Sequence, residues 1–168
     1  MLDAARGQLD AYGDRFETYR ADIEEPGWRR DRPLDAVVSM LAVHHLEGER
    51  KRELFADVLG SLRPGGALVV ADLIAPASSL GVELARRKWD EAVEETSLEL
   101  RGDREAHEAF RHLQWNLYDD MLGDPIDHPS GIVEQLQWLL SAGYVDVDVY
   151  WMKAGHAIFG GTKPLRIR

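Results

Sequence analysis

Two apolar runs, separated by a helix and a glycine turn, constrain this chain more than any other feature of its sequence. The first run, residues 34–40, is continuous and bounded by polar residues, which is typical of a strand buried on both faces of a sheet. Residues 48–62 then place apolar side chains at helical spacing. A Pro-Gly-Gly turn at 64–66 leads into the second run, residues 67–73. A strand, a helix and a strand in this order predict a right-handed parallel unit.

Helices, one weak strand and a terminal hairpin account for the rest of the chain. Apolar spacing predicts helices over residues 1–12, 79–100, 104–122 and 130–142. Weak alternation around Phe16 and Tyr19 favours a short strand over 15–21. Clear alternation near the end predicts a hairpin of residues 145–152 and 156–163. One strand of this hairpin should join the parallel pair in antiparallel direction.

Residues 34–72 resemble the centre of class I, Rossmann-like methyltransferases, which use S-adenosylmethionine. In that family an Asp opens the fourth strand, a small residue ends it, a hydrophobic-His-Leu tail follows, and a basic-Pro-Gly-Gly turn enters the fifth strand. The matching residues here are Asp35, Ser39, His45-Leu46 and Arg63 to Gly66. Residues 130–163 resemble the last helix and the closing hairpin of the same domain.

The resemblance implies an α/β fold in one domain over residues 1–168, with a Rossmann-like methyltransferase sheet that carries equivalents of strands 3 to 7. Residues 79–122 would form a helical insertion after strand five, where the family often has a substrate lid. The family's glycine-rich loop and the acid after its second strand have no counterpart in the sequence. We therefore interpret the chain as the C-terminal two-thirds of the family's domain.

The weak strand over residues 15–21 would then lack its usual neighbour, strand two. Its backbone groups would be left without partners within the chain. We expect this segment to pair with a second copy and form a homodimer, to move beside strand four, or to lack order.

S-adenosylmethionine is the cofactor that the resemblance implies. It places Asp22 at the end of strand three, where a carboxylate accepts a hydrogen bond from the adenine amino group, and Ile23 against the adenine ring. Asp22 is equally explained as a carboxylate that caps a turn or a helix. Ligands of doubly wound sheets bind at the carboxyl ends of the strands. The residues expected beside the methionine part of the cofactor are therefore Ser39, Met40, Leu41 and Ala42.

His44 and His45 are the candidate catalytic residues, because an imidazole titrates near neutral pH and can act as a general base. Adjacent residues near a strand end point in different directions, so the two side chains should not share one site. We expect His45 to pack or hydrogen-bond within the fold and the other histidine to face the substrate. A structural role for both is the alternative.

Asp72, Trp115 and Tyr118 are the candidates for substrate contact. Asp72 lies at the carboxyl end of the second apolar run. Trp115 and Tyr118 lie three residues apart on one face of the predicted 104–122 helix, where they form an aromatic pocket or bury against the sheet. No histidine spacing resembles a metal site, so no metal is predicted.

Composition narrows the class of partner. A net charge of −10 argues against binding to a nucleic-acid backbone, which requires massed Lys and Arg. No apolar run is long enough to cross a bilayer, and the first residues do not resemble a secretory signal. These features favour a cytoplasmic protein that acts on a small molecule.

Two functions are compatible with this sequence. The first is S-adenosylmethionine-dependent methyl transfer to a small-molecule acceptor, impaired to the extent that cofactor-binding strands are missing. The second is a non-catalytic remnant, or one half of an assembly whose partner supplies those strands. A nicotinamide oxidoreductase is disfavoured, because its fingerprint loop is equally absent while the His-Leu tail and the hairpin favour the methyltransferase group.

Overall fold

The computed structural model describes residues 2–29, 32–121 and 124–165. The chain forms two compact units, Met1–Asp31 and Arg32–Arg168. Each unit is described by itself.

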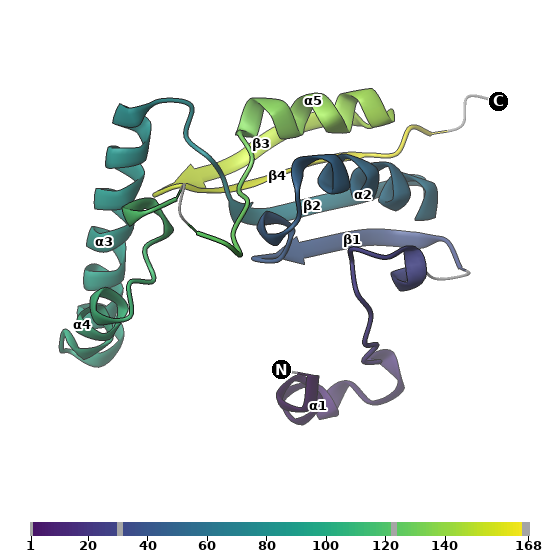
Figure 1. Ribbon diagram of the computed structural model, residues 1–168. Helices are drawn as coiled ribbons and strands as arrows, with labels where there is room; N and C mark the ends of the chain where they lie inside the picture. Colours follow the sequence, from purple (N-terminus) through teal and green to yellow (C-terminus); the bar gives the residue numbers. More distant parts are fainter. Residues whose placement is uncertain (1, 30–31, 122–123, 166–168) are drawn as a thin grey trace. The chain divides into compact units, whose positions relative to one another are not determined.

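The first unit contains one short helix and two 3-10 turns. Helix α1 (Leu2–Leu9) leads into η1 (Asp10–Arg15), and η2 (Pro26–Trp28) follows later (Figure 1). The strand predicted over residues 15–21 is wrong, because residues 16–22 have no regular structure. No strand pairs with them, so their weak alternation is not supported by a hydrogen-bonded ladder. A homodimer through this segment stays a prediction, and it would require the strand to form on association.

The second unit is built on a four-stranded sheet with the order β1-β2-β4-β3. The strands are β1 (Leu34–Met40), β2 (Leu62–Leu73), β3 (Val145–Lys153) and β4 (His156–Thr162). Strands β1 and β2 are parallel, and β4 runs antiparallel to both β2 and β3. The predicted parallel pair and the antiparallel hairpin are therefore confirmed.

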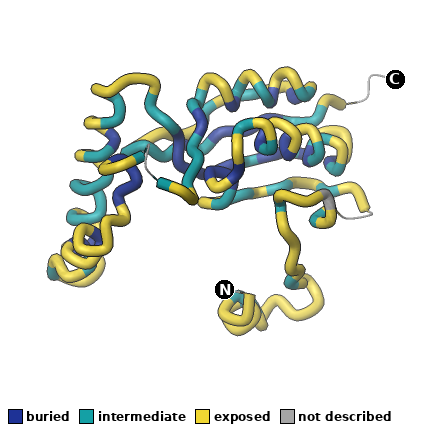
Figure 2. Tube along the Cα trace, in the orientation of Figure 1, coloured by how far each residue is buried: buried dark blue, intermediate teal, exposed yellow. Residues whose placement is uncertain are grey.

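Helices α2 (Gly48–Ser61) and α5 (Ile132–Ala142) cover one face of this sheet (Figure 1). Buried residues lie along these helices and along β2 and β4, and together they form the core (Figure 2). The largest contributors are Leu54, Phe55 and Val58 of α2, Leu139 of α5, Leu68 and Val70 of β2, and Phe159 of β4.

The segment between β2 and α5 is helical but less regular than predicted. Helix α3 (Ser79–Arg101) matches the prediction and packs with the shorter α4 (Glu105–His112) (Figure 1). The single helix predicted over 104–122 is wrong, since the chain leaves the helix at Gln114, which has a φ of 53°. The Asn116 side chain then caps a separate 3-10 turn, η4 (Leu117–Asp119), by accepting a hydrogen bond from the Tyr118 amide.

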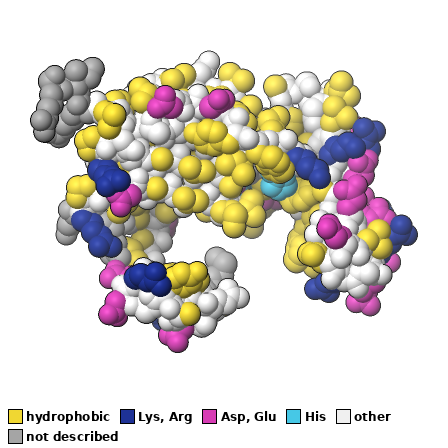
Figure 3. Space-filling view, turned by 180° about the vertical axis from the view of Figure 1, so that it is seen from behind, with side chains coloured by type: hydrophobic (Ala, Val, Ile, Leu, Met, Phe, Trp, Pro, Cys, Tyr) yellow, Lys and Arg dark blue, Asp and Glu magenta, His cyan; other side chains and the backbone are white. Residues whose placement is uncertain are grey.

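Strand β1 is an exposed edge strand, and the prediction that it is buried on both faces is wrong. Val38 and Met40 are 71% and 72% exposed. They point to the face of the sheet opposite α2 and α5, over which apolar side chains gather in the rear view (Figure 3). An apolar run shows that side chains avoid water, but it cannot show which residues cover the strand.

Truncating a valine should therefore have very different effects on neighbouring strands. Val38→Ala should change the free energy of unfolding by less than about 0.5 kcal/mol, because most of its side chain is already in water. Val70→Ala, at a fully buried position of β2, should cost about 2 kcal/mol. Urea denaturation of both variants measures the difference. Equal losses would show that Val38 is covered in solution.

Candidate functional site

The carboxyl ends of the parallel strands β1 and β2 meet at one edge of the sheet, and the candidate site lies there. After β1 the chain turns sharply at Leu41, which has a φ of 49° and donates its amide to Ala71 O (2.9 Å). A short 3-10 turn, η3 (Val43–His45), follows. Asp72, next to last in β2, lies against this turn.

Asp72 is a buried carboxylate that organises the turn after β1. Its Oδ2 accepts backbone hydrogen bonds from Val43 (2.7 Å), His44 (3.1 Å) and Ala42 (3.3 Å). Its Oδ1 accepts from the Leu73 amide (2.8 Å) and from His44 Nδ1. Burial raises its pKa, but the hydrogen bonds from His44 and from the backbone amides outweigh burial and leave the pKa below the ordinary value. Both oxygens are occupied, so Asp72 positions the turn rather than facing a substrate as predicted.

His44 lies between two carboxylates. A carboxylate only accepts hydrogen bonds, so the contact with Asp72 keeps the proton on Nδ1 and leaves Nε2 as the acceptor of a neutral ring. Nε2 lies 3.4 Å from Asp127 Oδ1.

His45 shares this site, which corrects two expectations. Its Nδ1 lies 2.8 Å from the same Asp127 oxygen, and the two imidazole rings are 4.0 Å apart. The histidines do meet at one site, because residues 43–45 form a 3-10 turn rather than the end of a strand. The expectation that His45 is the histidine packed within the fold is also wrong. His44 is buried, whereas the His45 side chain is 48% exposed.

The loop that carries Asp127 is held in place by buried polar contacts. The His128 amide donates to His44 O (2.8 Å). Lys51, fully buried on α2, donates to His128 O and to Ser130 Oγ (2.8 Å). Burial lowers the pKa of Lys51 to about 8, although Asp72, Glu134 and Glu47 act in the opposite direction. These contacts fix Asp127 beside the two histidines.

Sequence patterns did not reveal Asp127 or Lys51 as parts of the site. His44, His45 and Asp127 offer ligand atoms that all lie within 4.8 Å of one another, a set that can hold a metal ion. Asp127 Oδ1 is buried and has no hydrogen-bond partner in the described part of the chain, and a proton on an imidazole or a cation would each satisfy it. No sequence spacing signals this grouping, because the carboxylate is far from the histidines along the chain.

The two predicted aromatic residues do not form a pocket together. Trp115 is 63% exposed in the turn after α4. Tyr118 is buried, and its hydroxyl donates to Ile74 O (2.8 Å) and Gly155 O (2.7 Å). Burial raises the pKa of the Tyr118 hydroxyl above its ordinary value. Tyr118 therefore matches the packing alternative, in which it buries against the sheet.

Removing the Tyr118 hydroxyl should destabilise the fold. Tyr118→Phe removes the hydroxyl that donates to the Ile74 carbonyl oxygen, while Gly155 O keeps the Ile74 amide as a donor, and the loss should cost about 1–3 kcal/mol in the free energy of unfolding. Tyr150→Phe, at a half-exposed residue of β3, is the matched control and should have little effect. Thermal and urea denaturation check both. If Tyr118→Phe left the free energy of unfolding unchanged, the hydroxyl would be expected to face a ligand instead.

The predicted cofactor-binding residues divide between the two units. Met40 and Leu41 are exposed at the carboxyl end of β1, flanked by the partly buried Ser39 and Ala42. This apolar surface fits one wall of a site for S-adenosylmethionine.

Asp22 and Ile23 belong to the other unit. Asp22 Oδ1 accepts a hydrogen bond from the Glu24 amide (2.9 Å), as the turn alternative requires.

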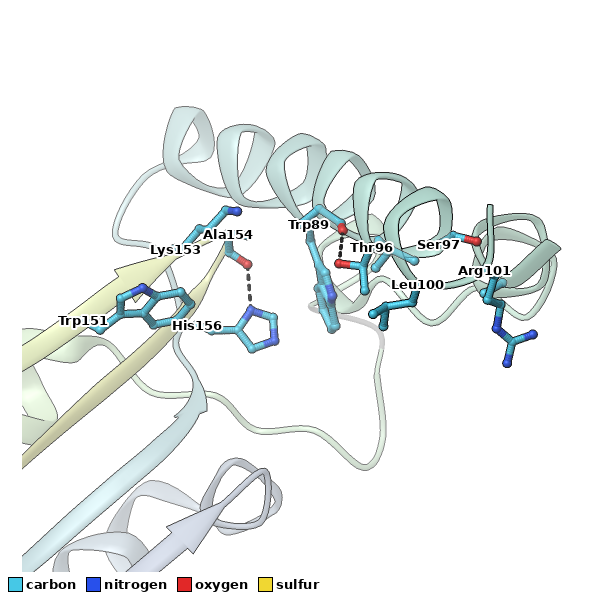
Figure 4. Close-up of a pocket in the computed structure, with 12 residues that line it drawn as sticks. Trp89, Thr96, Ser97, Leu100, Arg101, Trp151, Lys153, Ala154 and His156 are labelled. Carbon is cyan, nitrogen blue, oxygen red and sulfur yellow. Dashed lines mark hydrogen bonds between the residues drawn. The ribbon is translucent and has the colours of Figure 1, made fainter. Parts of the chain in front are cut away.

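A pocket of about 390 Å³ opens between α3 and the β3–β4 turn (Figure 4). Trp89 of α3 and His156 of β4 face one another across it, with their rings edge to face at 4.7 Å. His156 Nδ1 donates to Ala154 O (2.9 Å). Burial lowers the pKa of His156; Asp72 opposes this shift and His44 adds to it. The pocket was not predicted, because its walls come from elements far apart in the sequence.

The comparisons with known proteins agree with this geometry. Residues 1–70 match the family model described as "Methyltransferase domain". No curated protein matches the chain. None of the helices in the described ranges is both long enough and apolar enough to span a membrane.

Solved methyltransferases share the fold. An O-methyltransferase family protein from Burkholderia thailandensis matches 99% of this chain with a TM-score of 0.63 and 15% identity, over 42% of its own length. The S-adenosylmethionine-dependent methyltransferase SibL matches 97% with a TM-score of 0.59 and 18% identity, over 40% of its length. PigF, solved with S-adenosylhomocysteine (SAH), matches 96% with a TM-score of 0.54 and 14% identity, again over 40% of its length.

The chain thus spans about two-fifths of these structures. The matched family and the shared sheet agree with the motif around residues 34–72. By fold, therefore, the chain is similar to solved S-adenosylmethionine-dependent methyltransferases, and its residues 1–70 match a methyltransferase family model.

Proposed function

We propose that this chain serves S-adenosylmethionine-dependent methyl transfer to a small-molecule acceptor, with His44 as the residue that removes the acceptor's proton. The observation that carries the proposal is the position of His44: it lies between Asp72 and Asp127 at the carboxyl ends of two parallel strands. Ligands of this kind of sheet bind at that edge.

The cofactor, when bound, supplies a methyl group on a positively charged sulfur. The chain's own contribution begins with position. Met40 and Leu41 offer apolar surface next to the turn that carries His44. Methyl transfer to an acceptor aligned at this edge would gain most of its rate from orientation, because the two reactants are already held together and need not meet by diffusion.

The second contribution is proton transfer. Asp72 keeps the His44 proton on Nδ1, so Nε2 is the atom that takes the proton from an acceptor hydroxyl or amine. The resulting imidazolium lies beside two carboxylates, which stabilise its charge. Asp72 and Asp127 act through His44 and are positioning residues.

The second candidate function, half of an assembly or a non-catalytic remnant, is favoured by a different observation. The chain spans about two-fifths of its structural neighbours, and its β1 edge carries exposed apolar side chains. In this form the chain alone should bind S-adenosylhomocysteine with a dissociation constant in the millimolar range or weaker, because each missing polar anchor costs about 1–3 kcal/mol and about 1.4 kcal/mol is tenfold in affinity.

Calorimetry with S-adenosylhomocysteine and transfer of a labelled methyl group at millimolar cofactor separate the two functions. A panel of hydroxylated and amine-bearing small molecules would serve as acceptors. His44→Ala should lower transfer by about 10²–10⁴-fold while cofactor binding is unchanged. The matched control, His45→Ala, should retain most of the activity.

Transfer that survives His44→Ala would overturn the role of His44. Binding and transfer that are both absent at millimolar cofactor would support the assembly or remnant. Activity restored by a second polypeptide would then support the assembly.

A further inference from the structure

We propose that the pocket between α3 and the β3–β4 turn binds the methyl acceptor, and that this acceptor is a planar aromatic molecule with an anionic group. The inference rests on the proposed function, since it names the acceptor class for the same site. Three observations carry it: the aromatic walls of the pocket, its cations without an ion-pair partner among the described residues, and the pairing of His156, which lines it, with the residue after Asp72.

The walls are suited to a flat ring. Trp89 is fixed by three neighbours, Phe110 at 5.5 Å, Tyr118 at 5.8 Å and His156 at 4.7 Å between ring centroids. Trp151 lines the other side and is 47% exposed, so part of its ring is available to a ligand. Aromatic faces and edges gain energy from offset or edge-on contact with a further ring.

The charges that line the pocket have one sign. Arg101 ends α3 at the far end of the pocket, and Lys153 lies at the β3–β4 turn (Figure 4). Neither side chain has a carboxylate within ion-pairing distance in the described part of the chain, and no Asp or Glu from that part lines the pocket. Because the whole chain has a net charge of −10, this local excess of cations favours an anionic ligand.

One residue that lines the pocket is linked to the proposed site through the β2–β4 ladder. His156 pairs with Leu73 in the β2–β4 ladder, one residue beyond Asp72. A volume of about 390 Å³ suits an acceptor of one or two rings, which is the size of ligand that such pockets enclose.

Binding of 6-hydroxy-2-naphthoate, measured by calorimetry and by tryptophan fluorescence, tests this inference without any methyl transfer. The corresponding amide, 6-hydroxy-2-naphthamide, is the neutral control ligand. The carboxylate should bind more tightly than the amide, and Lys153→Met or Arg101→Met should each weaken its binding about threefold. The double variant should weaken it about tenfold and remove the preference over the amide. Trp151→Leu should weaken both ligands.

Arg87→Met is the matched control, because Arg87 lies on α3 but does not line the pocket. Equal affinity for carboxylate and amide would overturn the anionic group, and no binding of either ligand would overturn the pocket. Binding without methyl transfer would overturn the proposed function alone. Transfer to neutral acceptors that is insensitive to Trp151→Leu would overturn this inference alone.

Discussion

Asp72→Ala should lower the free energy of unfolding by about 3–5 kcal/mol, one of the two largest losses that we expect from a single substitution in this chain. The alanine would leave the amides of Val43 and His44, and the His44 ring, without the carboxylate that accepts their hydrogen bonds. Their burial prevents water from replacing it. Urea denaturation followed by circular dichroism measures the change.

Asp35→Ala is the matched control, since Asp35 forms an exposed ion pair with Arg63 (2.7 Å). Such pairs contribute about 0–1 kcal/mol. A similarly small effect of Asp72→Ala would show that the turn after β1 does not depend on its carboxylate.

The same carboxylate predicts acid sensitivity. The pKa of Asp72 is lowered in the folded chain, so its contribution is complete above the ordinary value of about 3.9 and is lost as the pH falls toward the folded pKa. The gap in stability between the original chain and Asp72→Ala should therefore be constant near neutral pH and shrink below about pH 4. A gap that grows on acidification would contradict this sign.

Gly160→Ala should be at least as destabilising, because β2 and β4 approach one another at this glycine. A Cβ at Gly160 would overlap the backbone carbonyl oxygen of Leu68, and a backbone atom cannot move aside as a side chain can. We expect a loss of about 3 kcal/mol or more and a disturbed β2–β4 pairing. Denaturation and amide exchange of β2 and β4 measure these effects.

Gly60→Ala is the matched control, and it should raise the free energy of unfolding rather than lower it. Gly60 lies in α2, and a Cβ there would meet nothing within 4 Å. Alanine favours the helix, so the chain should gain up to about 1 kcal/mol. If both glycine variants behaved alike, the close approach of the two strands would be refuted.

The sequence predicted the elements whose pattern is local. The parallel pair, the helix between its strands and the closing hairpin follow from periodicity and from turn residues, and the structure contains all of them. The strand predicted from the weak alternation of residues 15–21 is wrong, because a strand needs a partner and no described strand pairs with this segment. The long helix over 104–122 failed because the chain turns at Gln114 and an Asn116 cap starts a new turn.

The candidate site could be predicted only in part. His44, His45 and Asp72 were identified because they end strands or follow them, but their mutual arrangement was not. The 3-10 turn at residues 43–45 brings both imidazoles to Asp127, a residue that no sequence spacing connects with them. The pocket likewise joins Trp89 of α3 to His156 of β4.

By itself, then, the sequence determined the order and type of the core elements and the edge of the sheet at which chemistry should occur. Periodicity and turn chemistry are local properties, and they are written in consecutive residues. The tertiary structure alone decided which apolar strand is covered, which carboxylate meets which histidine, and where a pocket opens beside α3. Val38 and Val70 show the difference: both belong to apolar runs, and only the packing of helices on one face of the sheet makes the second of them core.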